Sequence, residues 1–194
     1  MPKETYIIIP SVSSERRKYI SMGVMTPDII ASNLVQIIPN ASHYHFGVLT
    51  SNVHMAWMRA VCGRLKSDYR YSNTIVYNNF PWPFSEKQTD LFAPNGTHQK
   101  AKNVSSEQIR VLKTKIEQTA QKILDARAKY PDSSLADLYD ETVMPPELRK
   151  AHQENDRAVM QAYGFNPKMT ESEIVAELFK IYERLCARIN KTKY

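Results

Sequence analysis

The sequence has few glycines, two cysteines and no long hydrophobic run. Its five glycines are scattered along 194 residues, so no glycine-rich loop is available to bind phosphate groups. The two cysteines, Cys62 and Cys186, lie far apart inside helical patterns, and we expect both to be reduced thiols. No apolar run approaches the roughly 20 residues that cross a membrane, and the first residues do not resemble a signal peptide. We therefore expect a soluble, cytoplasmic protein with no membrane partner.

Reactive side chains are not grouped in the way that catalysis requires. His43 and His45 would share one face of a strand, but a zinc site needs about four ligands and the other candidates are isolated. Neither cysteine has a histidine and an acidic residue nearby in the sequence, and the carboxylates of the second half lie among lysines, as on a solvated helix face. We expect no catalytic residue and no metal site in this chain.

Basic residues outnumber acidic ones, and the excess is concentrated in the first half. The chain has 26 lysines and arginines against 20 acidic residues, which gives a formal charge of +6. Residues 1–84 hold 8 of the basic and 4 of the acidic residues, a net charge of +4 on few charged side chains. This bias suits a polyanionic partner such as a nucleic acid, and it equally suits a generic basic surface.

Strand patterns surround one helix in the first half. Runs of β-branched and aromatic residues predict strands at 5–9, 19–25, 34–38, 44–50 and 75–77. Ser51 is a good N-cap for a helix whose apolar residues recur every three or four positions from Val53 onward, and Gly63 fits the C′ position after it. Residues 1–84 therefore predict a β-rich module.

The second half is helical throughout. Residues 85–104 are polar, contain a Pro-Asn-Gly turn and predict a linker or loop. Two capping boxes follow, and apolar residues spaced for helices continue almost to the C-terminus. The expected fold class is α+β, with a β-rich module at 1–84, a linker at 85–104 and an all-α helical module at 105–194.

The segment from Arg64 to Ser72 has the most informative polar pattern. In an extended conformation one face carries Arg64, Lys66, Asp68, Arg70 and Ser72. A two-stranded ribbon fits the major groove of DNA, where Lys66 can donate to guanine and Asp68 can accept from the paired cytosine. An acidic residue is unfavourable for contact with phosphates alone, so Asp68 favours base reading. The alternative is a polar edge hairpin backed by tyrosines.

Two further segments have simpler interpretations. The basic triplet Arg16, Arg17 and Lys18 predicts phosphate contacts, or a solvated basic loop. Residues 77–84 are rich in aromatics and prolines, and we interpret them as a rigid strip that packs against the helical module rather than as a platform for stacking bases.

A resemblance to a known family lies in five stretches of the chain, which are residues 13–23, 30–72, 75–83, 145–165 and 170–185. These stretches resemble the C-terminal part of MmeI-like DNA methyltransferases, which are type IIL restriction-modification proteins. The resemblance implies a DNA target recognition domain and a C-terminal helical region, taken from enzymes that use S-adenosylmethionine to methylate adenine N6 at a specific site. It also implies that Lys66 and Asp68 set the base at one position, with Arg70 and Leu34 addressing a neighbouring base pair. Arg64 and Ser72 are then expected to contact the DNA backbone.

The sequence lacks the motifs with which this family binds its cofactor and transfers the methyl group. It lacks a glycine-rich cofactor motif, and neither residues 78–81 nor residues 144–147 reproduce the family's Asn-Pro-Pro-Tyr motif. We therefore expect a non-catalytic recognition module that binds duplex DNA and the methyltransferase domain of a larger parent protein. S-adenosylmethionine would be the cofactor of the parent, with none in this chain. The alternatives are a protein-interaction module whose helical half docks on a partner, and an enzyme in its own right.

Overall fold

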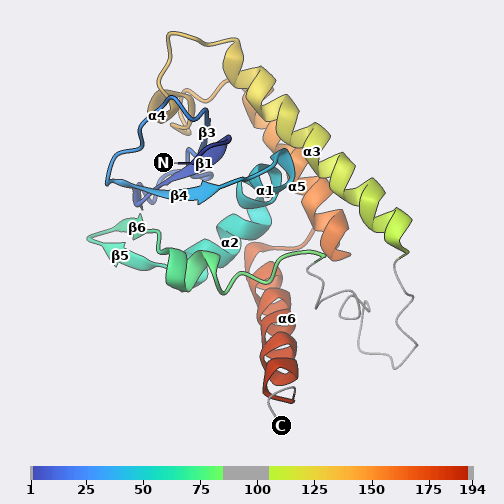
Figure 1. Cartoon of the computed structure of the whole chain (residues 1–194). Helices are drawn as coiled ribbons and strands as arrows, with labels where there is room; N and C mark the ends of the chain where they lie inside the picture. The colour runs from blue at the N-terminus through green and yellow to red at the C-terminus, as the bar shows by residue number, and fades with distance from the viewer. Residues whose placement is uncertain (1, 85–104, 192–194) are drawn as a thin grey trace.

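A computed structural model of the chain describes residues 2–84 and 105–191, with side chains described as far as residue 187 (Figure 1). Small antiparallel sheets occupy the first part and long helices the second, so the predicted α+β class is confirmed. The predicted linker, residues 85–104, lies outside the described residues.

Two three-stranded antiparallel sheets lie in the first part. The first sheet contains, in spatial order, β3 (Gly23–Met25), β1 (Tyr6–Pro10) and β4 (Val35–Pro39). The second contains β2 (Val12–Ser13), β6 (Asp68–Arg70) and β5 (Gly63–Leu65). Ser11 joins the sheets, because its N–H donates to the Leu34 carbonyl and its own carbonyl accepts from the Tyr71 N–H, both at 2.9 Å.

The described helices form the rest of the molecule. They are α1 (His43–Leu49), α2 (Asn52–Val61), the π-helix η1 (Asn73–Tyr77), α3 (Ser106–Ala128), α4 (Leu135–Leu138), α5 (Pro146–Tyr163) and α6 (Glu171–Lys191). The long helices α3 and α5 run side by side, α1 packs on α3, and α6 packs on α2 and projects from the body (Figure 1). None of the described helices is long and apolar enough to cross a membrane.

The strand predicted at 44–50 is wrong, because this segment forms α1. The backbone N–H of Ser42 donates to Nδ1 of His45 at 3.1 Å, which caps the first turn. Gly47 lets the helix approach α3 so closely that an added Cβ would lie 2.6 Å from Cγ2 of Ile116. Residues 46–49 are all buried. An apolar run buried on every side has no visible period, so a helix and a strand look alike in the sequence.

Three smaller predictions also differ from the structure. The strand expected at 19–25 pairs only as β3, and residues 75–77 belong to η1, where the Asn79 side chain donates to the carbonyls of Thr74 and Ile75. Gly63 is not a left-handed C′ residue. Helix α2 ends because Cys62 is extended, with φ −71° and ψ 154°, and Gly63 begins β5.

One hydrophobic core includes residues from both parts of the chain. Trp57 of α2, Ile116 of α3 and Val159 of α5 belong to the same buried cluster. The aromatic-proline strip is packed as predicted: Phe80 is 4% exposed, and the Pro81 carbonyl accepts from the Tyr163 hydroxyl at 2.8 Å. The first part is therefore held by direct contact with α5.

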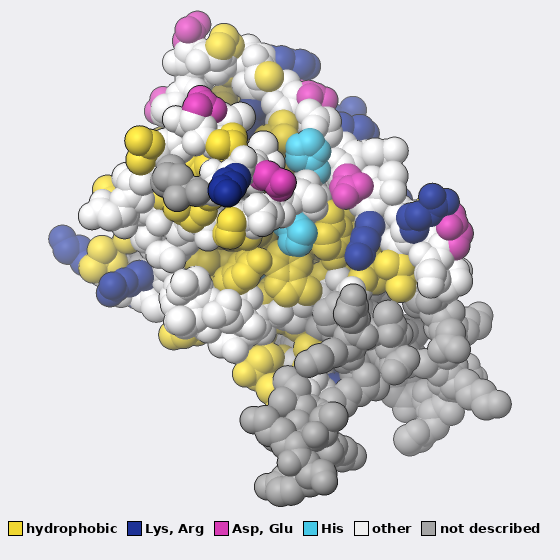
Figure 2. Space-filling view, viewed as in Figure 1, with side chains coloured by type: hydrophobic (Ala, Val, Ile, Leu, Met, Phe, Trp, Pro, Cys, Tyr) yellow, Lys and Arg dark blue, Asp and Glu magenta, His cyan; other side chains and the backbone are white. Residues whose placement is uncertain are grey.

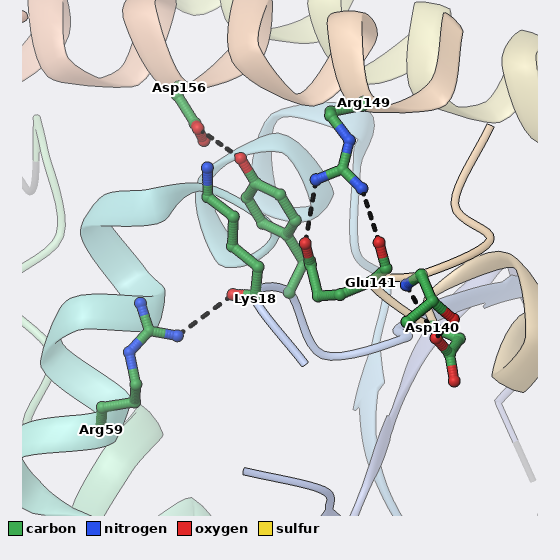
Figure 3. Close-up of polar contacts among 8 residues, drawn as sticks. Lys18, Arg59, Asp140, Glu141, Arg149 and Asp156 are labelled. Carbon is green, nitrogen blue, oxygen red and sulfur yellow. Dashed lines mark hydrogen bonds and ion pairs between the residues drawn. The ribbon is translucent and has the colours of Figure 1, made fainter. Parts of the chain in front are cut away.

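The carboxylate of Asp156 is the main polar link between the parts. One of its oxygens accepts from the backbone N–H of Asn52 at the start of α2, at 2.7 Å. The other accepts from the Tyr19 hydroxyl, also at 2.7 Å (Figure 3). Asp156 is 7% exposed. Burial raises its pKa from 3.8 to about 6, and the two hydrogen bonds and the nearby Lys18 only partly oppose that increase.

This raised pKa predicts a specific pH dependence. The folded protein holds the Asp156 proton more tightly than the unfolded chain, so this group stabilises the fold below pH 4 and loses that contribution as pH rises through about 6. Asp156→Asn keeps an acceptor for Asn52 but does not titrate. Between pH 4 and pH 7, the wild-type free energy of unfolding should fall by about 2 kcal/mol relative to the variant. Urea unfolding of both proteins measures this difference, and parallel pH profiles would contradict it.

Candidate nucleic-acid interface

A short hairpin made of β5 and β6 projects from one edge of the molecule (Figure 1). The predicted two-stranded ribbon is therefore present. Its cross-strand pairs are Gly63–Arg70, Arg64–Tyr69 and Leu65–Asp68. Lys66 and Ser67 form the turn between the strands. Lys66 has a φ of 57°, whereas Ser67 has a negative φ, a combination found in type II′ turns.

The ribbon has one buried and one exposed face, because residues directly opposite on antiparallel strands point to the same side. The buried face carries Tyr69, which is 7% exposed, and its partner on β2, Ser13, which is 3% exposed. The other face, called the reading face below, carries the exposed residues Val12, Gly63, Leu65 and Arg70 and the half-buried Asp68. In Figure 2, basic and hydrophobic side chains lie together at the projecting end of the ribbon.

The prediction that one face carries all five alternating polar residues is wrong. The alternation restarts at the two-residue turn, so Arg64 lies opposite Tyr69 and on the other side from Asp68. The Arg64 guanidinium lies 4.0 Å from the centre of the Tyr69 ring, and its NH1 donates to the Ser67 carbonyl at 2.8 Å. NH1 also lies 3.9 Å from the carboxylate of Glu15. Arg64 therefore supports the turn, and its contact with a DNA backbone stays a prediction.

Buried aromatic residues pack next to the ribbon and support it. Next to β6, the Tyr71 hydroxyl lies 2.9 Å from Nε2 of His54, a side chain that is fully buried in α2. Burial lowers the pKa of His54 to about 3, so its ring is neutral at physiological pH. The Trp57 indole donates to the carbonyl of Val76 at 3.0 Å. These contacts fix the ribbon relative to α2, as a reading surface requires.

Two predicted site residues flank the ribbon. Leu34 is 72% exposed, and Ser11 bonds to it on one side and to Tyr71 on the other, so Leu34 lies beside the strand that pairs with Arg70. The Ser72 hydroxyl shares a hydrogen bond of 2.8 Å with the Thr74 hydroxyl. Leu34 and Arg70, 36 positions apart in the sequence, thus lie on either side of the segment formed by Ser11 and Val12.

The basic triplet follows β2 in a loop, but its three members have different surroundings. Arg16 is exposed. Arg17 donates to the carbonyl of Ala136 in α4 at 3.4 Å. The ammonium of Lys18 lies 5.4 Å from the centre of the Tyr19 ring, and its backbone carbonyl accepts from Arg59 (Figure 3). Arg16 is therefore the member of the triplet best placed to contact a phosphate.

Sequence reasoning missed the apolar part of the reading face. Val12 is 38% exposed and lies opposite Arg70, and Leu65 is 51% exposed and lies opposite Asp68. Such exposed apolar groups can contact the methyl group of thymine. The sequence signal that could have revealed these residues is the length of the turn. A two-residue turn determines which residues are paired across the strands, and therefore which residues share a face. Among the described residues, no group of three or more potential metal ligands is present.

Comparison with known proteins identifies related chains. Residues 1–84 match the family "MmeI, target recognition domain", and residues 110–190 match "MmeI, C-terminal domain". DNA methyltransferase A of Bacillus subtilis (strain 168) is 38% identical over 182 residues, which are 94% of this chain and 18% of that protein. A solved structure of the type IIL restriction-modification enzyme MmeI in complex with DNA is 41% identical, with a TM-score of 0.79 over 96% of this chain and 22% of that one. The chain thus spans about a fifth of each relative.

The positive φ of Lys66 predicts a strained turn. A residue with a Cβ is disfavoured at this φ, whereas glycine adopts it freely. Lys66→Gly should therefore raise the free energy of unfolding by about 1 kcal/mol relative to Lys66→Ala, which removes the same side chain and keeps the strain. Urea unfolding of the two variants measures the difference. Equal stability of the two would show that the turn is not strained.

Proposed function

The chain belongs to the MmeI family, whose target recognition and C-terminal domains it carries, and from this premise we propose that it reads duplex DNA for an adenine-N6 methyltransferase. The methyltransferase domain of a larger parent protein is its proposed partner. This chain and the methyltransferase domain would both act on DNA, so the proposed place of action is the cytoplasm. The solved relative is a restriction-modification enzyme in complex with DNA, which supports DNA as the ligand.

The reading face is the observation that carries this proposal. It projects from the body on a narrow two-stranded ribbon, the shape of element that enters a major groove. Lys66 at the turn offers a donor, and Asp68 at the start of β6 offers an acceptor. A G·C pair presents acceptors on guanine and a donor on cytosine, so two adjacent side chains can address both bases.

We propose a division of roles among the predicted site residues. Lys66 and Asp68 read one base pair, and Arg70 with Leu34 reads its neighbour. The remaining predicted site residues contact the DNA backbone. They are Arg16, Arg17, Lys18, Arg64 and Ser72. In this arrangement residues 1–84 bind DNA, and residues 105–194 hold them in place through the shared core.

The described residues do not fit a methyl-transfer site. Residues 78–81, which lack the paired prolines of the family's catalytic motif, are used in packing: the Asn79 amide donates to the carbonyls of η1, and Phe80 is buried. In the other proline-containing segment, Met144 and Pro145 are buried at the start of α5. We therefore assign S-adenosylmethionine and the transfer step to the parent protein.

A salt titration separates the proposed function from the alternatives. The purified chain is mixed with a labelled random-sequence duplex at low and high salt, and its affinity is measured by fluorescence anisotropy. Binding that weakens steeply with salt supports a DNA-binding module. An absence of binding at low salt would instead favour a protein-interaction module. Methyl transfer by this chain from S-adenosylmethionine would overturn the assignment of catalysis to the parent.

The base-reading pair predicts a change in sequence preference. Replacing Lys66 and Asp68 together with alanine in a complete family enzyme that carries this ribbon should relax the base preference at one position of the methylated site. Each lost polar base contact should remove about 1–3 kcal/mol of discrimination. Sequencing of the methylated sites measures the preference. An unchanged methylation pattern would refute the assignment of these two residues.

The proposed phosphate contact of Arg16 predicts a loss of affinity that does not depend on the DNA sequence. Arg16→Ala removes a phosphate contact, so binding should weaken by a similar factor on every duplex, and the slope of log affinity against log salt should fall by about one unit. Arg110→Ala is a suitable control, because its charge lies on α3 and is already paired with Glu107 at 2.7 Å. A loss confined to one sequence would contradict a phosphate role for Arg16.

A further inference from the structure

Most of the described glycines have a reason within the fold. At Gly23 an added Cβ would collide with the side chain of Met25, and at Gly47 it would lie 2.6 Å from Ile116. Gly164 has a φ of 69°, the left-handed conformation that ends α5 and that glycine adopts without strain. Gly47 and Gly164 therefore exclude a larger residue, and at Gly23 the flexible end of Met25 and the Ile8 side chain, 3.1 Å away, leave little room for one.

Gly63 has no such reason among the described residues. Its φ lies outside the left-handed range, and an added Cβ would meet no atom within 4 Å. It stands in strand β5, where glycine is less favourable than alanine because it loses more conformational freedom on folding. The fold would therefore accept a side chain at this position and gain stability from it.

Because Gly63 has no side chain, it leaves an open space on the reading face. Gly63 lies directly opposite Arg70 on the reading face, and Val12 flanks Arg70 on its other side. A gap thus lies beside Arg70 and next to the pair formed by Leu65 and Asp68. Glycine within a strand often marks a site where a ligand comes close to the backbone.

We propose that Gly63 is a specificity-determining residue: its bare backbone lets the edge of a base pair approach the sheet beside Arg70. This inference rests on the proposed function, because it takes duplex DNA as the ligand. A methyl group at residue 63 would occupy the space that the base edge enters. It would hold the ribbon away from the groove floor and lengthen the contacts that Arg70 and Asp68 make to bases.

Gly63→Ala tests this role in the chain as it stands. The wild-type chain first selects its preferred sequence from a randomised duplex library. Affinity for that duplex and for a scrambled duplex is then measured by fluorescence anisotropy, together with the urea midpoint. We expect Gly63→Ala to keep or raise the urea midpoint and to bind the selected duplex about tenfold more weakly, the size of one lost base contact. Affinity for the scrambled duplex should change less than twofold, because phosphate contacts dominate it.

A matched glycine variant provides the control. Gly164→Ala forces a strained conformation at the end of α5, so it should lower the urea midpoint and leave DNA affinity of the folded protein unchanged. Unchanged affinity of Gly63→Ala for the selected duplex would overturn the inference and leave the proposed function standing. An equal loss of affinity for both duplexes would also overturn the inference, because it would show that the DNA backbone, and not the edge of a base pair, lies close to Gly63. A wild-type chain that binds neither duplex would remove the proposed function as well.

Discussion

The carboxylate of Asp156 is the interaction on which the placement of the recognition elements depends. It lies on α5 and accepts the first free N–H of α2, where a negative charge is favoured by the helix dipole. Helix α2 in turn carries His54 and Trp57, which hold the segment following the ribbon. A buried carboxylate with a raised pKa is unfavourable by itself, so this link contributes orientation more than stability. It fixes where α2, and with it the ribbon, lies relative to the helical part.

Other buried hydrogen bonds also fix the first part of the chain relative to the long helices. The Asn155 side chain donates to the carbonyl of Gly47 in α1 at 2.7 Å and accepts from the Thr119 hydroxyl of α3 at 3.0 Å. The buried guanidinium of Arg127 donates to the carbonyl of Met22 at 2.8 Å. Hydrophobic packing alone tolerates small shifts between helices, whereas each of these hydrogen bonds requires one alignment. A protein that reads base edges needs such alignment, because contacts to bases fail when the reading element moves by about an ångström.

The sequence predicted the elements that have a visible period or a clear cap. Helix α2 begins after Ser51, α3 after the capping box at Ser105, and the ribbon lies where the alternation of Arg64 to Ser72 placed it. Helix α1 was missed because burial on all sides removes the period. The two faces of the ribbon were misassigned because they depend on the length of the turn, and Lys-Ser is not one of the usual turn sequences. Contacts between distant segments, such as Leu34 with Ser11, leave no mark in a single sequence.

Lys66 and Gly63 depart from local preference in opposite ways, and both lie in the same ribbon, Lys66 at its turn and Gly63 at the start of β5. A lysine occupies a turn position that favours glycine, while a glycine occupies a strand position that favours a side chain. Exchanging the two residue types would make the isolated hairpin more stable. Positions at which a sequence breaks a local rule without gain in packing are expected at functional sites. The proposed contact with DNA gives both departures a common cause, because it uses an ammonium group at the turn and an open backbone at Gly63. Neither departure is explained by the core beneath, so we attribute the sequence of the ribbon to this proposed contact and its position to α2 and α5.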